Sequence, residues 1–455
     1  MFKNILQNRE YNPIQQKSAE FVLSQSGEYL RPLEKKLSKQ IDDRYVRTFF
    51  DLFIAILMFR NRPMSLLLSE LGGWIAGFDR APNGTKRISR LLRFKKWGHE
   101  LIQDFFFDQG KQRMEKLQAA DKTPLLLWDD SQVEKPESWF LGGLCSVMSS
   151  KSKRLTRIKP GYYNPPVKRV CVPGYKWTGI NLTALGEIPS VFQMEWWTTR
   201  GVHKEQGSNI IYRMLKKIDD RIGRMALHVF DRGYASAKMV EWLTDFKQDF
   251  LIRWKSNHFM IDQNGEKKKI FNIAKSHRGK YRKTVWDKQR KKQKRVTIAW
   301  TAIKHPELTD NQLYLVIVRD KNNYNSPMYL VTNVKIENAA DAWKMMHAYM
   351  KRWDIEQAFR CCKAELGCES PRLWFFKNTL KLLSILTLVY DFLLRMICNW
   401  KPWVQRLFQQ WAYRTGNRYR QATIPIYRLR AAVSNVLLSL FFTQLAITRG
   451  YALSP

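Results

Sequence analysis

Three acidic positions that lie far apart in the chain carry the chemistry that this sequence suggests. Asp129 or its neighbour Asp130 ends the apolar run TPLLLWDD, and Asp231 ends a second short apolar run, MALHVFD. The third acid, Glu356, lies in the charged segment YMKRWDIEQAFRCCK, residues 349–363. Carboxylates that a fold brings together can hold hard divalent cations such as Mg²⁺ or Mn²⁺. Two such ions can cleave a phosphodiester by activating the attacking oxygen and stabilising the leaving oxygen.

The charged segment separates into two faces if it forms a helix. At about 100° per residue, one stripe holds Tyr349, Arg352, Glu356 and Lys363. Asp354 faces the opposite side. Glu356 would then share its face with a phenol and two cations, which could hold a phosphate beside a bound metal. An i,i+4 ion pair between Arg352 and Glu356 is the better explanation of the segment alone; the acids upstream and the basic surplus favour the metal site.

The overall charge points to a polyanionic partner. The chain has 455 residues, with 78 Lys and Arg against 40 Asp and Glu, and a net charge of +38. A field of this sign attracts nucleic acid. A ribosomal or membrane-surface protein is the alternative, but 45% hydrophobic residues and 17 tryptophans argue against a ribosomal tail. The composition therefore favours a folded nucleic-acid-binding protein of two or three domains.

Cysteine spacing and hydropathy indicate a cytoplasmic protein. The six cysteines have neither the density of a disulfide scaffold nor the paired spacing of a zinc site, so we expect buried or inert thiols. The N-terminus turns polar too early for a signal peptide. Residues 49–59 are too short to span a membrane, and residues 379–400 contain Lys381, Asp391 and Arg395. The longer run therefore predicts a buried helix.

Helical periodicity dominates the first part of the chain, up to about residue 120. Within it, residues 83–98 predict a basic helix that Thr85 caps and Gly98 ends. Its cations are Lys86, Arg87, Arg90, Arg93, Lys95 and Lys96. A DNA-reading helix and a solvated face of a packing helix explain this pattern equally well.

The next part alternates between short strands and helices. Strands are predicted at 123–130, 175–185, 190–199, 225–231 and 249–255, and helices at 209–222 and 236–246. Strands followed by helices indicate an α/β sheet. Sites in such sheets form at the carboxyl ends of strands, where the acids of the first two positions lie.

A basic, β-rich segment interrupts this alternation. Residues 265–295 carry fourteen Lys and Arg against two acids, with Phe271, Tyr281 and Trp286 among them. Aromatic rings threaded through cations favour a surface that grips a phosphate backbone and stacks on bases, over a merely solvated loop. A second basic loop, 151–169, has no acid. A strand at 327–333, a long helix at 338–366 and a helical, basic tail follow.

These motifs resemble those of bacterial insertion-sequence transposases of the DDE type, in the insertion sequence four group with the Y-x2-R-x3-E-x6-K motif. Tyr349, Arg352, Glu356 and Lys363 have that spacing. VFDRGY, 229–234, is similar to the second-aspartate motif, and LLLWDDSQ is similar to the first, of the form D-x-[S/T]. The resemblance thus favours Asp129 over Asp130 as the first acid, and it covers about residues 120–370.

The resemblance implies an α/β fold with an RNase H-like mixed-sheet catalytic core, a β-rich insertion and helical N- and C-terminal domains. The predicted regions are an N-terminal DNA-end-binding domain 1–120, the first part of the core 121–255, the insertion 256–335, the last core helix 336–370 and a C-terminal region 371–455 that could pair two subunits. The 125 residues between Asp231 and Glu356 leave room for that insertion.

The resemblance also implies a function, which is cut-and-paste transposition of DNA with metal-dependent strand cleavage and strand transfer. The implied ligands of two Mg²⁺ or Mn²⁺ ions are Asp129, Asp231 and Glu356, and the implied phosphate-binding residues are Tyr349, Arg352 and Lys363. The expected partners are the double-stranded DNA of transposon ends and target, and a second subunit, with no membrane and no small-molecule cofactor. A nuclease or resolvase without strand transfer, and a silent DNA-binding derivative, are the alternatives.

Overall fold

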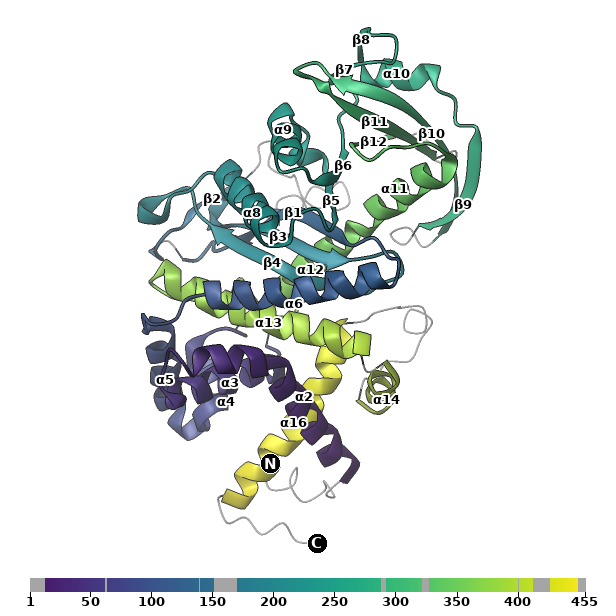
Figure 1. The fold of residues 1–455 in the computed structure, drawn as a ribbon. Helices are drawn as coiled ribbons and strands as arrows, with labels where there is room; N and C mark the ends of the chain where they lie inside the picture. The colour runs from purple at the N-terminus through teal and green to yellow at the C-terminus, as the bar shows by residue number, and fades with distance from the viewer. Residues whose placement is uncertain are drawn as a thin grey trace, which may run out of the picture.

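The computed structural model describes residues 13–61, 64–138, 140–150, 170–287, 292–320, 327–399, 401–411 and 426–448 (Figure 1). The basic loop predicted at 151–169 lies outside these described residues. The helices of eight or more residues are α2 (Pro13–Leu37), α3 (Asp43–Met58), α4 (Leu68–Ala76), α5 (Ala81–Arg93), α6 (Glu100–Ala119), α8 (Gly207–Ile222), α9 (Ala237–Asp245), α11 (Ala339–Lys351), α12 (Trp353–Ala364), α13 (Phe376–Asn399), α14 (Lys401–Trp411) and α16 (Ile426–Thr448).

Shorter helical segments and twelve strands complete the described part of the chain. The short helices are η1 (Phe78–Arg80), η2 (Gly201–His203), η3 (Arg232–Tyr234) and α10 (Ile270–Ser276). The strands are β1 (Leu125–Glu134), β2 (Cys145–Met148), β3 (Cys171–Thr183), β4 (Ser190–Trp197), β5 (Leu227–Phe230), β6 (Asp249–Arg253), β7 (Phe259–Ile261), β8 (Lys267–Lys269), β9 (Tyr281–Asp287), β10 (Lys292–His305), β11 (Leu308–Asp320) and β12 (Met328–Thr332). The strands and helices predicted between 123 and 255 are confirmed, with boundaries shifted by a few residues.

All twelve strands belong to one mixed sheet with the order β2-β3-β1-β5-β6-β12-β11-β10-β7-β8, in which β4 also pairs with β3 and β9 with β10. β1, β3 and β4 are antiparallel neighbours, whereas β5 and β6 run parallel to β1 on its other side. This is the strand order of an RNase H-like core. The predicted fold class, a mixed-sheet α/β core with helical flanks, is confirmed.

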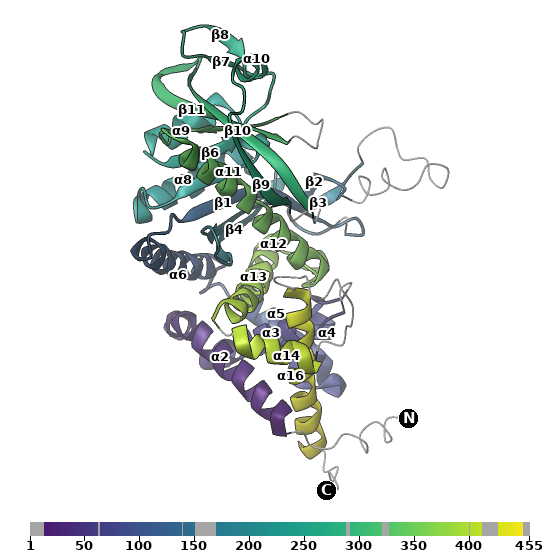
Figure 2. The same cartoon turned by 90° about the vertical axis from the view of Figure 1, so that its right-hand side faces the viewer.

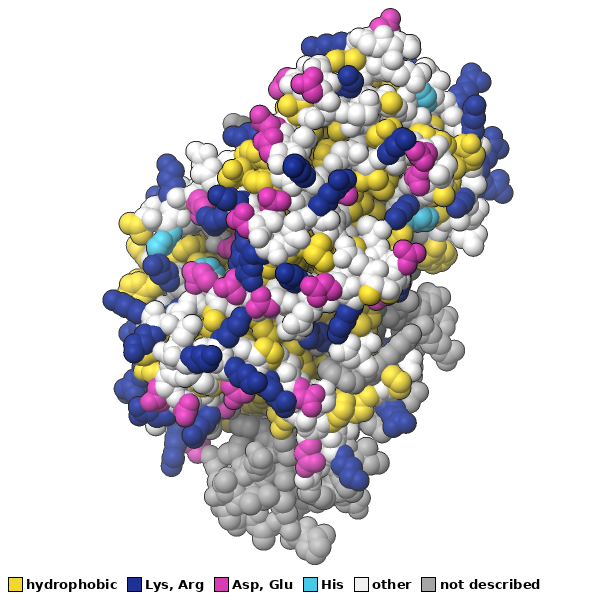
Figure 3. All heavy atoms as spheres, in the orientation of Figure 1, with side chains coloured by type: hydrophobic (Ala, Val, Ile, Leu, Met, Phe, Trp, Pro, Cys, Tyr) yellow, Lys and Arg dark blue, Asp and Glu magenta, His cyan; other side chains and the backbone are white. Residues whose placement is uncertain are grey.

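The basic insertion continues the sheet of the core. β12 pairs antiparallel with β6, and β11 and β10 follow it outward. Lys and Arg side chains gather along the outer edge of this part, over β9 (Figure 3). The limits of the five predicted regions stay a prediction, but the catalytic core and the insertion share one hydrogen-bonded sheet.

The alternation of side chains along the strands builds a core on each face of the sheet. Leu125 and Leu127 of β1 pack in one hydrophobic cluster with α11, α12 and α13, whereas Leu126 and Trp128 pack in the other with α8, α9 and α10. Figure 2 shows α11, α12 and α13 following one another along the same side. Because neighbouring strand residues point to opposite faces, each acid on β1 is committed to one of these two sides.

The predicted buried helix is α13, which lies between the sheet and the N-terminal helices (Figure 1). Its charged residues have partners on other elements. Lys381 donates to the carbonyls of Leu92 and Phe94 at 3.0 and 2.8 Å. Asp391 accepts from the Tyr29 hydroxyl at 3.0 Å. Buried charges of this kind are tolerated only when they are paired, so α13 joins the N-terminal helices to the core.

The basic helix differs from its prediction at both ends. α5 begins at Ala81 and ends at Arg93, and Arg80 is its N-terminal cap. Thr85 lies inside the helix, where its hydroxyl donates to the carbonyls of Leu68 and Ala81. The short helix Phe78–Arg80 leads directly into α5, so α5 begins before Thr85. α5 also packs closely on α4, because a Cβ on Gly84 would lie 2.1 Å from the Gly72 carbonyl oxygen.

The cysteines of the chain are all free thiols. Four of the six are buried: Cys145, Cys361, Cys362 and Cys368. In the part of the chain that the structure describes, no helix is long and apolar enough to cross a membrane.

Candidate active site

Two of the predicted acids reach the same region from neighbouring parallel strands. β1 and β5 pair in register from Leu125 with Leu227 onward, so their carboxyl ends lie side by side. Asp129 lies on β1, two residues beyond the last pair of that register. Asp231 follows the last residue of β5 and caps the short helix η3. The structure therefore brings these two strand-end acids to the same region, where both lie near Arg352.

The third acid comes from a helix that is not continuous. The sequence predicts one helix at 338–366, but α11 ends at Lys351 and α12 begins at Trp353. The amide of Arg352 donates to the Tyr349 carbonyl at 3.0 Å, which is an i→i−3 bond that tightens the last turn of α11. The prediction of one continuous helix is wrong, yet Tyr349, Arg352 and Glu356 still face the two aspartates across the turn.

The Arg352 guanidinium lies at the centre of the three acids. Its Nη1 donates to Asp129 Oδ2 at 3.1 Å, its Nη2 donates to Glu356 Oε1, and its Nε lies 3.9 Å from Asp231 Oδ1. The Tyr349 hydroxyl donates to Asp231 Oδ1 at 2.9 Å. The structure therefore brings together Asp129, Asp231, Glu356, Tyr349 and Arg352, which the sequence predicts from three separate segments.

A glycine on the neighbouring strand lets α12 come this close. Gly179 of β3 pairs with Asp129 in the antiparallel ladder. A Cβ at this position would lie 2.9 Å from the Phe359 ring of α12. Phe359 also packs edge-on against Trp177, with ring centroids 4.5 Å apart. Because any side chain at Gly179 would push Phe359 away, the glycine sets the distance between Glu356 and the sheet.

Burial and charge act differently on the two aspartates. Burial raises the pKa of Asp129 to about 7, against the opposing charge of Arg352. Burial also acts to raise the pKa of Asp231, but Arg352 and the hydrogen bonds from Arg232 and Tyr349 outweigh it, so that pKa lies below its usual value. Two acids of one cluster with opposite pKa shifts are typical of functional sites.

The two neighbouring acids on β1, Asp129 and Asp130, lie on opposite faces of the sheet. Asp130 points to the other face, where its carboxylate accepts from the Thr178 hydroxyl at 2.6 Å. Burial raises the pKa of Asp130, and Tyr234 is among the groups that oppose this. Asp129 therefore lies with Asp231 and Glu356, and Asp130 lies on the far side of the strand.

Lys363 and Asp354 of the same segment lie outside the cluster. Lys363 is two turns beyond Glu356 and faces Glu134, where its charge adds to hydrogen bonds from Ser150 and Ser149 that together lower the pKa of Glu134 despite burial. Asp354 pairs with Lys351 at 2.5 Å, on the side away from the acids, as the helical spacing predicts. The structure therefore does not join Lys363 to the three acids.

One cation of the site was missed at the sequence level. Arg253 ends β6, next to β5, and its charge acts on both Asp231 and Tyr349. Its position at the carboxyl end of a parallel strand was the available signal, but the prediction considered only acids at such ends.

The donor set has the chemistry of a magnesium site, although its geometry is that of an ion-pair cluster. Three carboxylates supply the hard oxygen ligands that Mg²⁺ and Mn²⁺ prefer. They outnumber the one guanidinium among them, so the cluster keeps a net negative charge when all three are ionised. Across the described residues, no three acids, histidines or cysteines lie close enough together to hold a metal as they stand.

The comparison with protein families supports a transposase-like region. Residues 198–392 match the family model of the transposase DDE domain. The match covers Asp231 and Glu356 but begins after Asp129. The predicted resemblance to DDE transposases is thereby supported over this range, and the narrower motif-defined group stays a prediction. Curated proteins gave no sequence match.

Among solved structures, a piggyBac transposase is distantly similar to this chain. It was solved by cryo-EM as a synaptic complex with hairpin DNA. The TM-score is 0.40 and the sequence identity is 11%, over 99% of this chain and 87% of that one. At these values the likeness adds nothing to what the fold and the family match show.

Proposed function

We propose that this protein is a DNA transposase that cleaves the ends of a mobile element and joins them to target DNA. The observation that carries the proposal is the meeting of Asp129, Asp231 and Glu356 around Arg352, within a chain whose residues 198–392 match a transposase DDE domain. The net charge of +38 supports a polyanionic substrate.

The acids are proposed as the catalytic ligands of two Mg²⁺ or Mn²⁺ ions. Asp129, Asp231 and Glu356 would hold them, and bound ions of this kind activate the attacking oxygen and stabilise the leaving one. Their carboxylates already face one common point, which the Arg352 side chain fills. Arg352 must therefore yield part of that space, and its fork is well suited to turn to a DNA phosphate beside the acids.

The remaining residues of the site are proposed to orient the Asp231 carboxylate and to neutralise the charge of the DNA phosphates. The Tyr349 hydroxyl fixes one oxygen of Asp231. Arg253 adds positive charge at the end of β6, where a phosphate approaching Asp231 would meet it. Lys363 lies farther along α12 and is proposed to contact the DNA backbone away from the scissile bond.

DNA binding is proposed to extend well beyond the acids. The insertion exposes Phe271, Tyr281 and Trp286 among its cations, which suits contact with a DNA strand. On α5, Lys86, Arg90 and Arg93 are exposed, but Arg87 pairs with Asp51 at 2.7 Å and so supports packing. The terminal repeats are proposed to be read by the N-terminal helices, and a second subunit to be bound by the C-terminal helices.

The main competing function is a nuclease of the same fold that cuts DNA without joining it. The test uses the purified full-length chain, Mg²⁺ and a plasmid carrying the inverted repeats that flank its gene. We expect strand cleavage, and transfer of a pre-cut end to a second plasmid. Cleavage without any transfer would favour the nuclease.

The variant Asp231→Asn tests the acid assignment in the same assay. We expect it to lose cleavage by about 10³-fold or more, the cost of about 4 kcal/mol of transition-state stabilisation, while it keeps end binding. Asp354→Asn is the matched control, because Asp354 lies two residues from Glu356 but faces away from the acids. Wild-type cleavage by Asp231→Asn would refute the proposed active site.

A further inference from the structure

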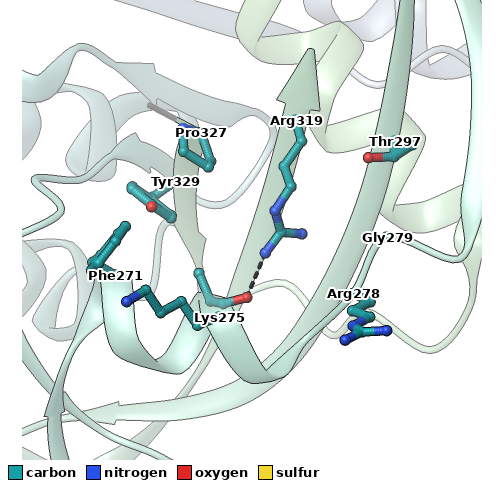
Figure 4. Close-up of a pocket in the computed structure, with 9 residues that line it drawn as sticks. Phe271, Lys275, Arg278, Gly279, Thr297, Arg319, Pro327 and Tyr329 are labelled. Carbon is teal, nitrogen blue, oxygen red and sulfur yellow. Dashed lines mark hydrogen bonds between the residues drawn. The ribbon is translucent and has the colours of Figure 1, made fainter. Parts of the chain in front are cut away.

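A second site, of opposite charge, lies in the insertion. A hollow of about 400 Å³ is lined by Phe271, Ala274, Lys275, Arg278, Gly279, Thr297, Arg319, Pro327 and Tyr329 (Figure 4). Its volume is in the range of pockets that hold small molecules. Three of these residues are cationic, and no Asp or Glu is among the described residues of the lining.

The hollow opens on the face of the sheet opposite the acids. Tyr329 of β12 packs in the hydrophobic cluster of α8, α9 and α10, whereas its neighbour Leu330 packs in the cluster of α11 and α12. Arg319 follows Ile317 on the same side of β11, and Ile317 belongs to the cluster of Tyr329. Because α12 carries Glu356, a ligand in the hollow would be separated from the acids by the sheet itself.

Two polar groups of the residues that line this hollow are buried without hydrogen-bond partners among the described residues. The Arg319 Nη2 donates to the carbonyl of Ala274 at the end of α10, but its Nη1 is buried with no hydrogen-bond partner among the described residues. The Tyr329 hydroxyl is likewise buried and unpartnered there, with the residue 2% exposed. Buried polar groups rarely lack partners. The Arg319 Nη1 and the Tyr329 hydroxyl are therefore both available to donate to a bound acceptor.

Around these two donors, the lining combines further positive charge with an exposed ring. In Figure 4 the Arg319 guanidinium extends between Lys275 and Arg278. The Lys275 ammonium lies 4.5 Å from the centre of the Phe271 ring, which is 43% exposed. An arginine fork recognises phosphate oxygens, and an exposed aromatic face stacks on bases. One hollow thus offers cations for the phosphate of a nucleotide and an exposed aromatic ring for its base.

We infer that this hollow binds a nucleotide, with its phosphate on Arg319 and the Tyr329 hydroxyl and its base on Phe271. Lys275 and Arg278 at the rim add attraction for the phosphate. The nucleotide could come from a DNA strand that crosses the insertion or from a free mononucleotide, since both present the same groups. The inference does not depend on the acids being catalytic.

Binding experiments with the full-length chain test this. The probes are a labelled, 5′-phosphorylated single-stranded decanucleotide, with unlabelled dAMP and inorganic phosphate as competitors. We expect Arg319→Gln and Phe271→Leu each to weaken decanucleotide binding by about fivefold or more. Lys304→Gln is the control, because Lys304 is an exposed lysine of β10 outside the hollow, and it should change binding by less than about twofold.

The competitors separate the two sources. Displacement by dAMP supports a free mononucleotide as a sufficient ligand, whereas decanucleotide binding that dAMP fails to displace supports a DNA strand. Equal displacement by dAMP and inorganic phosphate, with no effect of Phe271→Leu, would overturn the inference that the ligand is a nucleotide. Unchanged binding by Arg319→Gln would overturn the site.

Folding and independence are controlled by two further variants. Arg319 also bonds to α10, so Lys275→Gln, at an exposed position, tests the same hollow without that contact. Asp354→Asn, which faces away from the acids and lies outside the hollow, should bind the decanucleotide as the wild type does, and this binding is scored separately from strand cleavage. A failed transposase proposal with an intact hollow is therefore recognisable.

Discussion

Two arginines define the contrast between the core and the insertion. Arg352 in the core is surrounded by three carboxylates and a phenol that orders one of them. Arg319 in the insertion has one carbonyl partner, with cations and aromatic rings around it. The core site therefore holds a net negative charge when its three acids are ionised, which suits metal cations, and the hollow in the insertion holds a net positive charge, which suits phosphates. One sheet separates the two sites by the alternation of its side chains.

This contrast also explains how a strongly basic chain can carry an acidic site. The three acids are partly buried, with side-chain exposures between 18% and 35%, and their partner charge comes from Arg352 in the turn between α11 and α12. The cations of the insertion stay exposed at the rim, where long-range attraction of DNA is strongest at low salt. The acids of the candidate site are thus less exposed than most cations of the insertion.

The largest effect should separate the neighbouring acids of β1. Asp129→Asn should lower strand cleavage by about 10³-fold or more, because it removes a proposed carboxylate ligand beside Glu356. Asp130→Asn should retain most activity, because Asp130 bonds to Thr178 on the other face. Cleavage rates of the two purified variants under the same Mg²⁺ concentration provide the measurement. A reversal of the two rates would move the site to the opposite side of the sheet.

A smaller effect should appear when the two arginines are compared in stability. Arg352→Gln should lower the free energy of unfolding by about 2 kcal/mol, because it leaves three partly buried carboxylates without their counter-charge. Arg319→Gln should cost about 1 kcal/mol or less, since one hydrogen bond to Ala274 is lost. Urea unfolding of both variants against the wild type measures this. Equal losses of unfolding free energy would contradict the distinction between Arg352, which is ion-paired to acids, and Arg319, which bonds to a carbonyl.

The smallest effect concerns the pH dependence of stability and a buried histidine on the face of the sheet opposite the acids. His228 of β5 is buried, accepts from Trp128 Nε1 at 3.1 Å, and burial lowers its pKa to about 4. In the unfolded chain the His228 imidazole binds a proton with a pKa near 6.5, whereas in the folded chain its pKa is about 4. The free energy of unfolding therefore falls as the pH drops from 6.5 towards 4.

Between pH 7 and 5.5 this histidine should account for about 1 kcal/mol of lost stability. His228→Gln keeps an acceptor for Trp128 and cannot titrate, so its stability should depend less on pH over that window. Urea midpoints of the two proteins at both pH values give the comparison. A parallel decline in the variant would place the pH sensitivity elsewhere in the molecule.

Much of the core could be predicted because its signals are local. Apolar runs gave the strands that carry Asp129 and Asp231, and the D-x-S spacing favoured the acid that the pleat turns towards Glu356. The helical stripe placed Tyr349, Arg352 and Glu356 together and Asp354 apart. The strands and the stripe depend on a few neighbouring residues and a known period, whereas the preference for Asp129 comes from the resemblance to a family motif.

The errors came from contacts between distant segments. The break at Arg352 and the separate environment of Lys363 follow from how α11 packs on the insertion and α12 on the core. The early start of α5 depends on the fit between Gly84 and Gly72. The pairing of β12 with β6, which makes insertion and core one sheet, is likewise non-local. A single sequence offers no period that encodes such contacts.

The central claim is that Asp129, Asp231 and Glu356 together hold divalent cations. Its most direct test is the anomalous scattering of Mn²⁺ in crystals of the full-length protein with bound DNA. The account predicts manganese between the three carboxylates, with the Arg352 guanidinium turned from its present position among them to a DNA phosphate. Manganese bound elsewhere, with Arg352 still paired to all three acids, would contradict it.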